Sequence, residues 1–239
     1  LLPLPIHIED NSCCFYILHD HRCGGERSRR SCQTMNEISA WIIDIRTMDS
    51  VKGVVGIDNL EAFRSSVFLN DIHRNYPGAK NLVKDEWDIT SEHIICTYHA
   101  EIVGSARVIP ASRGALPFTS NVSEPFMVSE IDSEMGRFVV RPDMRKGPAF
   151  LGLLIGCAAV YREQAYARAL NGAIYADVII EGRSRLNERT YKTLGFKSSN
   201  VKYFDKDYAA ECEIFVIDKA NRNMFMDYVH KMYKHYRAN

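Results

Sequence analysis

The sequence lacks the features that most quickly place a chain in a special class. Its 30 basic residues equal its 30 acidic ones, so no net charge directs it to nucleic acid or an anionic membrane. It has no apolar run of about 18 residues or more, as a transmembrane helix needs, and its longest run, residues 149–161, is typical of a buried helix. The chain has 46% hydrophobic and 25% charged residues, and this composition excludes collagen-like, coiled-coil and largely disordered proteins.

Several catalytic and cofactor-binding motifs are also missing. The chain has no G-x-S-x-G elbow, no G-x-G-x-x-G fingerprint and no Walker loop, which argues against hydrolases, dinucleotide enzymes and P-loop proteins. Cys13, Cys14 and Cys23 lie near two histidines but lack the paired spacing of zinc modules. We therefore expect no metal and no bound cofactor.

The seven cysteines and the absence of a signal-peptide pattern predict a reducing, cytoplasmic location. Cys96, Cys157 and Cys212 each stand alone in apolar surroundings, as reduced buried thiols do. Residues 1–50 contain a Gly-Gly pair and a run of arginines, and we interpret them as a leader of uncertain order. The length of 239 residues then predicts a single domain over residues 51–239.

Hydrophobic periodicity divides the rest of the chain into helices and strands. We expect helices over residues 59–75, 149–170, 184–194 and 221–237. We expect strands over residues 93–98, 101–110, 134–140, 173–180 and 211–217, the first two joined by a tight turn at His99-Ala100. This order predicts an α/β (α+β) fold around one mixed sheet.

Residues 134–149 form a strand, a basic turn and the start of an apolar helix. Backbone N–H groups of such a turn and the helix dipole favour an anion. Arg145 and Lys146 add positive charge, and Gly147 lets the backbone approach a ligand closely. The segment therefore predicts a phosphate site, and a solvated basic face remains the alternative.

The sequence YKTLGF, residues 191–196, places a tyrosine one turn before a helix-ending glycine. Gly195 is typical of a helix stop and Phe196 of a core residue. Neither role explains Tyr191, whose hydroxyl would suit a general acid beside a cleft.

Together these segments resemble the GNAT acyltransferase superfamily. The resemblance implies a mixed twisted sheet flanked by helices, with a V-shaped splay between central strands that holds an acyl-pantetheine thioester. Met144 stands where the family's phosphate turn has Gln or Arg, while Gly147 and Ala149 match. This departure favours acyl carrier protein, with its single phosphate, over coenzyme A as the donor.

The first half of the chain resembles acyl-homoserine-lactone synthases, a GNAT-like branch that uses acyl carrier protein. A tryptophan of that branch is absent here, and the Asp88-x2-Ser91-x-His93 pattern is closer to N-acyl amino acid synthases. The matching residues are Arg64, Phe68, Asp85, Asp88, Arg107, Glu134 and Arg137.

The reaction that the resemblance implies assigns roles to these residues. Glu134 is our candidate for the base that takes the amine's proton, with Arg137 beside it on the strand. Residues three apart on a regular strand face opposite sides, so the two are not expected to pair directly. A structural ion pair of Glu134 with Arg107 or Arg137 is the alternative. Backbone N–H groups at Phe138, Val139 and Val140 would hold the thioester oxygen.

The remaining polar set would bind the charged acceptor or order a loop over it. Its members are Arg64, Asp85, Asp88 and Arg107, with Phe68 and His93. A surface salt-bridge network explains the charged members equally well, and a satisfied structural histidine explains His93.

We therefore expect an N-acyltransferase that moves a fatty acyl group from acyl carrier protein to an amino acid or similar small amine. The alternatives are a lactone synthase using S-adenosylmethionine, an acyl-CoA N-acetyltransferase, and a non-catalytic acyl sensor. Acyl carrier protein would dock on the basic set Arg141, Arg145, Lys146, Arg183, Arg185 and Arg189. An apolar stripe on the last helix predicts packing on the sheet, with membrane-surface contact as the alternative.

Overall fold

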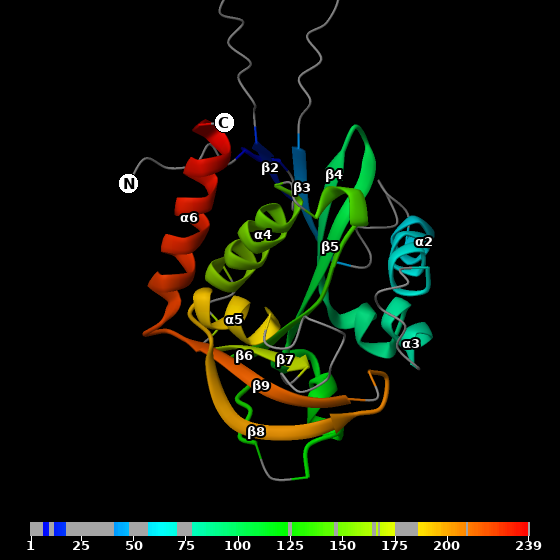
Figure 1. The fold of residues 1–239 in the computed structure, drawn as a ribbon, viewed down its shortest axis with the longest axis vertical. Helices are drawn as coiled ribbons and strands as arrows, with labels where there is room; N and C mark the ends of the chain where they lie inside the picture. Colours follow the sequence, from blue (N-terminus) through cyan, green and yellow to red (C-terminus); the bar gives the residue numbers. More distant parts are fainter. Residues whose placement is uncertain are drawn as a thin grey trace, which may run out of the picture.

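A nine-stranded sheet with helices on both faces forms the chain (Figure 1). The computed structural model describes residues 7–9, 12–17, 41–47, 57–70, 78–123, 126–145, 148–163, 166, 168–174, 186–208 and 210–238. The strand order is β1-β2-β3-β4-β5-β6-β7-β9-β8. The β6–β7 pair is parallel and all other neighbours are antiparallel, so the sheet is mixed, as predicted.

The first half of the sheet is an antiparallel run of five strands. They are β1 (His7–Glu9), β2 (Ser12–Ile17), β3 (Trp41–Thr47), β4 (Glu92–Tyr98) and β5 (Glu101–Pro110). The turn between β4 and β5 is the predicted one, with φ of 49° at His99 and 63° at Ala100. Since β1–β3 lie within residues 1–50, the predicted boundary at residue 50 does not separate the strands of this sheet.

The second half of the sheet contains the predicted V-shaped splay. It consists of β6 (Asp132–Val140), β7 (Arg168–Ile174), β8 (Lys197–Asp205) and β9 (Ala210–Asp218). β6 pairs with β7 only from Asp132 to Glu134. Beyond Glu134, β6 continues along β5 to Val140, whereas β7 continues along β9 to Ile174. The two strands therefore diverge from Glu134 onward.

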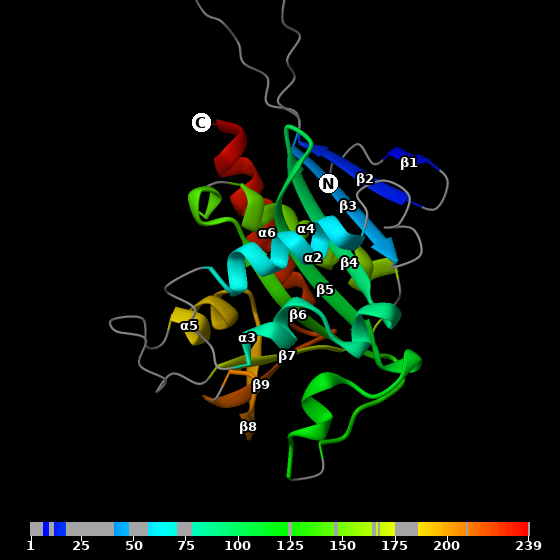
Figure 2. The ribbon, with the colours of Figure 1, turned by 90° about the vertical axis from the view of Figure 1, so that its right-hand side faces the viewer.

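Helices cover the two faces of the sheet unequally (Figures 1 and 2). On one face lie α4 (Ala149–Glu163), α5 (Leu186–Thr193) and α6 (Arg222–Ala238). The other face carries α2 (Ile57–Phe68) and α3 (Ala79–Val83). Short 3₁₀ turns connect the elements: η2 (Glu86–Thr90), η3 (Ala111–Arg113), η4 (Pro117–Ser120) and η5 (Pro142–Met144).

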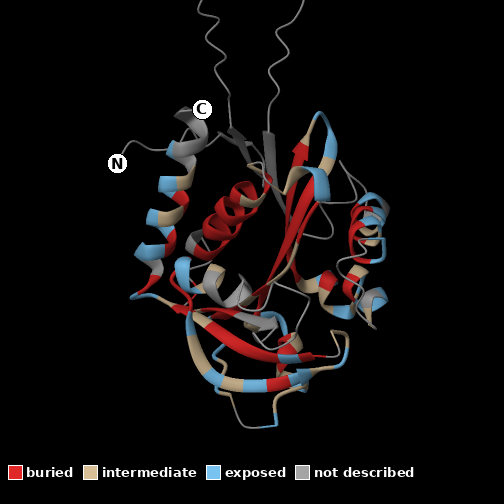
Figure 3. Cartoon of the chain, in the orientation of Figure 1, coloured by how far each residue is buried: buried red, intermediate tan, exposed pale blue. Residues whose placement is uncertain are grey.

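The main core lies between α4 and the sheet. α4 is apolar on all sides, and every residue from Leu151 to Tyr161 is buried (Figure 3). A smaller cluster beneath α2 contains Phe63, Phe68 and Leu82, and a third joins residues 111–128 to β8 and β9. No described helix is both long and apolar enough to cross a membrane.

Some predicted boundaries were wrong. The helix predicted to reach residue 170 ends at Glu163, and residues 168–170 already belong to β7, because tertiary pairing overrides their helical composition. The strand predicted over 173–180 therefore starts earlier, and residues 175–180 lie outside the described residues. The last helix packs its buried Phe225 and Val229 into the core cluster built around α4.

Candidate functional site

Glu134 stands where β6 and β7 part. It is the last residue of β6 that pairs with β7, opposite Leu170, and on its other side it pairs with Ile109 of β5. Its Oε2 atom is buried and has no hydrogen-bond partner among the described residues. A carboxylate oxygen that is buried and unpaired in this way is costly unless a ligand or a proton completes it.

The surroundings of Glu134 raise the pKa of its carboxyl to about 7. Burial is the main cause, because it disfavours the charged form, and the nearby positive charge of Arg107 opposes it. A carboxyl with this pKa is partly ionised at neutral pH and can both accept and release a proton.

A β-bulge follows Glu134 on the same strand. Ser105 pairs with Val139 but Arg107 pairs with Gly136, so β6 has one extra residue there. Arg137 at the bulge has a φ of 54°, which non-glycine residues rarely adopt. The extra residue shifts the alternation, and Arg137 donates from Nη2 to Asp85 Oδ2 at 2.8 Å and to the Asn81 carbonyl at 3.1 Å.

The edge of β6 beyond Glu134 faces the diverging strand. Because β7 no longer pairs with it there, the peptide groups on that edge have no ladder partner in β7. The segment includes Phe138, Val139 and Val140, the predicted oxyanion residues. Their side chains are packed within the protein: Phe138 packs against Phe150, and Val139 and Val140 are buried. Only their backbone is therefore available to a ligand.

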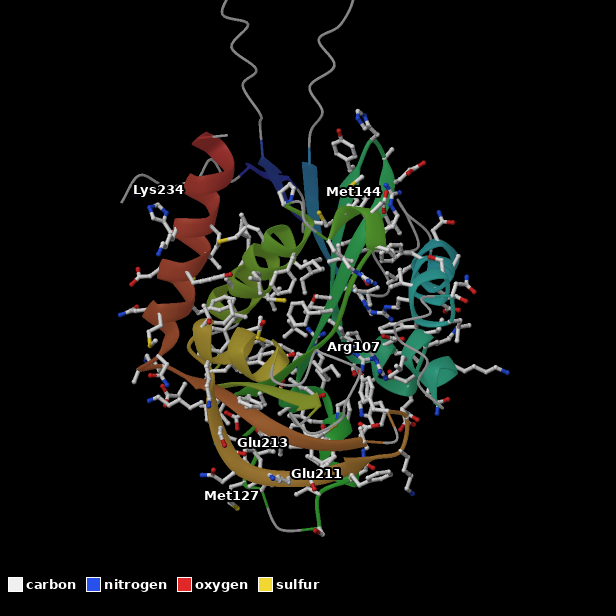
Figure 4. The ribbon with its side chains drawn as sticks, in the orientation of Figure 1. Arg107, Met127, Met144, Glu211, Glu213 and Lys234 are labelled. Atoms are coloured by element: carbon white, nitrogen blue, oxygen red, sulfur yellow. The ribbon has the colours of Figure 1, made fainter. Side chains whose placement is uncertain are left out.

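A buried ion network joins the predicted acceptor residues on the α2/α3 face. Asp88 Oδ1 accepts from Arg64 Nη1 and from Arg107 Nη1, both at 2.9 Å. Arg107 Nη1 also contacts Asp85 Oδ1 at 2.5 Å, and Asp85 reaches Arg137 through its other oxygen. Figure 4 shows Arg107 extending from β5 toward α2 and α3. The predicted alternative of a salt-bridge network at the surface differs from the structure in its location, since Arg64, Asp88 and Arg107 are at most 3% exposed.

Local structure fixes the two aspartates. Asp85 caps η2 by accepting from the Trp87 N–H, and Asp88 accepts in turn from the Asp85 N–H, which together form a capping box. Burial alone would raise the pKa of both carboxyls, but the ion pairs, with Arg64 and Arg107 for Asp88 and with Arg107 for Asp85, hold them below their usual values. Both aspartates are therefore charged at neutral pH.

The network carries unequal charge. Three arginines, Arg64, Arg107 and Arg137, face two aspartates, Asp85 and Asp88, so one positive charge remains. Arg107 Nε and Arg64 Nε are also buried without a hydrogen-bond partner among the described residues. The site is therefore set up to receive an anionic or hydrogen-bond-accepting group near Glu134.

His93 is fully buried and has a partner at each ring nitrogen. Nδ1 lies 3.2 Å from Arg64 Nη2, and Nε2 lies 2.9 Å from the Asp88 carbonyl. Nδ1 therefore accepts and Nε2–H donates, which requires the neutral ring. Burial, with Arg64 as the next cause, lowers its pKa to about 4. This geometry supports the structural interpretation of His93.

The His93 environment predicts a pH-dependent stability difference. Between pH ~6.5 and ~4 the unfolded chain binds a proton that the native ring refuses, so acid removes about 3 kcal/mol of stability. Glu134, whose pKa is raised, acts in the opposite direction over most of this range, so the effect has to be measured as a difference. Urea unfolding of the wild type and His93→Gln at pH 7 and pH 4.5 should show the wild type losing its advantage in acid. An unchanged difference would contradict this account.

The β8–β9 turn closes over α3 next to this network. The Gly78 N–H donates to the Asp207 carbonyl at 2.9 Å, and Asn81 Nδ2 donates to Asp207 Oδ1 at 2.7 Å. A Cβ on Gly78 would lie 2.4 Å from Asp207 Cα, so only glycine permits this approach. Tyr208 of the same turn acts electrostatically on Arg137, which places it beside the site.

Other predicted site residues lie away from the ion network or outside the described part of the chain. The ring of Tyr191 stacks on Phe215 and meets Phe196 edge-on, within the α4 side of the core. Phe68 packs in the cluster beneath α2. Arg145 donates from Nε to the Val140 carbonyl at 3.2 Å, whereas Lys146 and Gly147 lie outside the described residues.

Sequence reasoning missed two residues near the site. Gly136, the bulge neighbour, carries no chemical group and gave no signal. Tyr203 lies on β8, which was not predicted because the strand is largely polar and its pairing is interrupted at Ser198–Lys202. Glu134 is among the groups that raise the pKa of Tyr203, after its burial and Cys212, so its ring lies on the Glu134 side of the sheet. Among the described residues, no three His, Cys, Asp or Glu side chains gather as a metal site would require.

A family model matches the part of the chain that carries the candidate site. Residues 63–155 match the family model of the acetyltransferase (GNAT) domain. This range contains the whole ion network, the bulge, Glu134 and the start of α4. No curated protein sequence matches the chain.

Solved structures share this fold at low identity. An acyl-CoA N-acyltransferase from Pseudomonas aeruginosa is 13% identical with a TM-score of 0.52, over 74% of this chain and 98% of that one. The CoA-dependent acyl-homoserine lactone synthase BjaI is 14% identical with a TM-score of 0.56, over 78% and 88%. The acyl-homoserine lactone synthase LasI is 14% identical with a TM-score of 0.54, over 75% and 90%.

Proposed function

We propose that this chain, whose residues 63–155 match the acetyltransferase (GNAT) domain, transfers a fatty acyl group from acyl carrier protein to the amine of an amino acid or a similar small amine. The observation that carries the proposal is Glu134, a buried carboxyl with a pKa of about 7 at the point where β6 and β7 diverge. A thioester in the splay and an amine beside the ion network would meet at this residue.

The proposed reaction needs no covalent enzyme intermediate. Glu134 takes a proton from the acceptor's ammonium group, and the free amine attacks the thioester carbonyl. Backbone N–H groups of the unpaired β6 edge at residues 138–140 stabilise the oxyanion. The carbon–sulfur bond then breaks as the attacking nitrogen loses its second proton, and the leaving thiolate gains one, so this proton moves from nitrogen to sulfur overall, with Tyr191 as our candidate for the group that donates to the thiolate. Holding both substrates in place supplies much of the rate.

The excess positive charge of the network supports an amino acid as acceptor. An amino acid presents an ammonium group and a carboxylate a short distance apart. Glu134 matches the first, and the buried, unpaired Arg107 Nε with the excess charge around it matches the second. Once Glu134 has taken the amine's proton and is neutral, an acceptor without a carboxylate would leave this charge uncompensated, which is costly in a buried site.

The phosphate turn and the basic surface bear on the choice of donor. Met144 in the phosphate turn favours a single-phosphate donor, as the sequence suggested. Of the predicted basic docking set, Arg141 already pairs with Glu101 and Asp143, so its charge is compensated within the chain. BjaI and MesI are described as CoA-dependent lactone synthases, which favours acylation of S-adenosylmethionine from acyl-CoA as the second candidate function.

A cytoplasmic location is part of the proposal, supported by the free, buried Cys96, Cys157 and Cys212.

A donor and acceptor screen by mass spectrometry tests the proposal. Long-chain acyl carrier protein, long-chain acyl-CoA and acetyl-CoA are each offered with the twenty amino acids and S-adenosylmethionine. An N-acyl amino acid formed from the carrier protein is the expected product. A lactone would establish the second candidate, acetylation alone would replace the fatty donor, and no product from any pair would overturn the proposal.

A further inference from the structure

Gly136 is a glycine that neither the backbone nor the packing requires. Its φ is not in the left-handed region, and an added Cβ would meet nothing within 4 Å among the described residues. Three other glycines differ from it. A Cβ on Gly78 would lie 2.4 Å from Asp207, and a Cβ on Gly104 would lie 3.3 Å from Leu153. Gly195 has a φ of 89°, which other residues rarely adopt. Only at Gly136, among these four, is a side chain both conformationally and sterically allowed.

A glycine inside a strand has a cost. It loses more backbone entropy on folding than other residues and offers no side chain to pack, so a strand interior favours almost any other residue. Glycine inside a strand often marks a bulge or a place where a ligand approaches the backbone closely. The bulge here has its left-handed residue at Arg137 and not at Gly136, so it does not itself require this glycine. The open space at Gly136 therefore calls for an occupant that is not a part of the described chain.

The surroundings of Gly136 indicate which occupant fits. Its ladder partner is Arg107, and Glu134 lies two residues away, so both flank the same face of β6. Arg107 is 3% exposed. Its Nε atom and the Oε2 atom of Glu134 are both buried and have no hydrogen-bond partner among the described residues. The open space thus lies between an unused cationic donor and the proposed base, where the acceptor must sit to be deprotonated.

We infer that Gly136 determines acceptor specificity: the space left by its missing side chain holds the acceptor's atoms next to the reacting nitrogen. The identity of the occupant rests on the proposed acyl transfer, whereas the open space at Gly136 does not. A larger residue at this position would keep the strand and the base and would exclude all but the smallest acceptors.

The test is a size series, Gly136→Ala and Gly136→Val, offered the acceptors of the screen with the donor held constant. Each added carbon in a fitted site costs about 10-fold or more in kcat/KM, so with bulky acceptors we expect ~10-fold loss for alanine, which adds one carbon, and ~1,000-fold for valine, which adds three. Glycine as acceptor should suffer least, which shifts the product distribution toward it. The donor's KM should stay within ~2-fold, because the thioester is proposed to contact the backbone edge of β6 at residues 138–140 and not the face of β6 beside Arg107.

Two controls separate specificity from misfolding. The melting temperature of both variants should equal or exceed that of the wild type, because any residue suits the strand better than glycine. Glu211→Val introduces the same β-branched side chain in place of an exposed glutamate of β9, which lies apart from Arg107 in Figure 4, and it should leave acceptor preference unchanged.

The outcomes distinguish this inference from the proposed function. If the wild type acylates amines and Gly136→Val shows the same preference, the space is solvent, and the inference falls while the function stands. If the wild type acylates nothing, the function falls, and calorimetric titration with the same amines decides the inference. Binding that Gly136→Val abolishes would then support it, and binding that is equal in both proteins, or absent from the wild type, would overturn it.

Discussion

Glu134→Gln should lower kcat/KM by about 10²- to 10⁴-fold, the usual contribution of a positioned general base. The amide has the shape of the carboxyl, so the β6 ladder and the bulge should persist. It cannot take a proton from the acceptor's ammonium group, and the attacking amine is then not generated in place. Steady-state kinetics with the pair identified by the screen measures the loss.

The pH dependence sharpens this prediction. Because the base works only when ionised and burial raises its pKa to about 7, the wild-type kcat/KM should rise as pH increases through about 7. This limb should disappear in Glu134→Gln. A matched control is Glu92→Gln, which neutralises a buried carboxylate of β4 that pairs with Arg113 outside the network, and it should keep the limb. If Glu134→Gln retains activity and the limb, Glu134 is only a structural ion-pairing residue.

The sequence predicted those parts of the fold that short-range patterns encode. The β4–β5 hairpin follows from alternation and a turn at His99-Ala100, and α4 follows from an apolar run that only a buried helix explains. β8 escaped prediction because the pattern of its residues carries no clear alternation, and its pairing with β9 rather than its own sequence makes it a strand. The end of α4 was misplaced for a related reason, since residues 168–170 are strand only because Asp132–Glu134 pair with them.

The site also has features that the sequence predicted and features that depend on long-range pairing. The resemblance to acyl-homoserine-lactone synthases, carried by residue spacing, placed Arg64, Asp85, Asp88 and Arg107 in one predicted set, and the structure joins them through ion pairs. What spacing could not predict is the bulge, because it is a difference in register between two strands. The bulge brings Arg137 onto the face of Asp85, against the expectation from regular alternation, and it places Gly136 opposite Arg107.

A further consequence of the structure is that the ion network supports the fold as well as the site. Its members come from α2, η2, β5 and β6, so it ties the helical layer to the strand that carries Glu134. Buried ion pairs are often no more stabilising than well-packed apolar groups, but breaking one leaves an uncompensated charge in the interior. The network is therefore where a single substitution should cost most stability.

Asp88→Asn should destabilise the protein by about 3–5 kcal/mol, the usual cost of removing one partner of a buried pair. Asp88 is 2% exposed and serves both Arg64 and Arg107, so its loss leaves two buried guanidinium groups short of charge. Glu101→Gln is the control: Glu101 also pairs with an arginine, Arg141, but is 71% exposed, and its loss should cost about 0–1 kcal/mol. Urea denaturation at pH 7 measures both, and a cost of under ~1 kcal/mol for Asp88→Asn would show that the network is not a stabilising element.

Two pH effects tie this variant to the chemistry. The pKa of Asp88 lies below its usual value in the native state, so its contribution is present above pH ~4 and is lost as pH falls. Wild-type stability should therefore approach that of Asp88→Asn in acid. The positive charge of Arg107 already lowers the pKa of Glu134, and without Asp88 that charge is less compensated. The acid limb of kcat/KM should then move below pH 7 in Asp88→Asn, and a limb that stays in place would show that the network acts on the fold and not on the base.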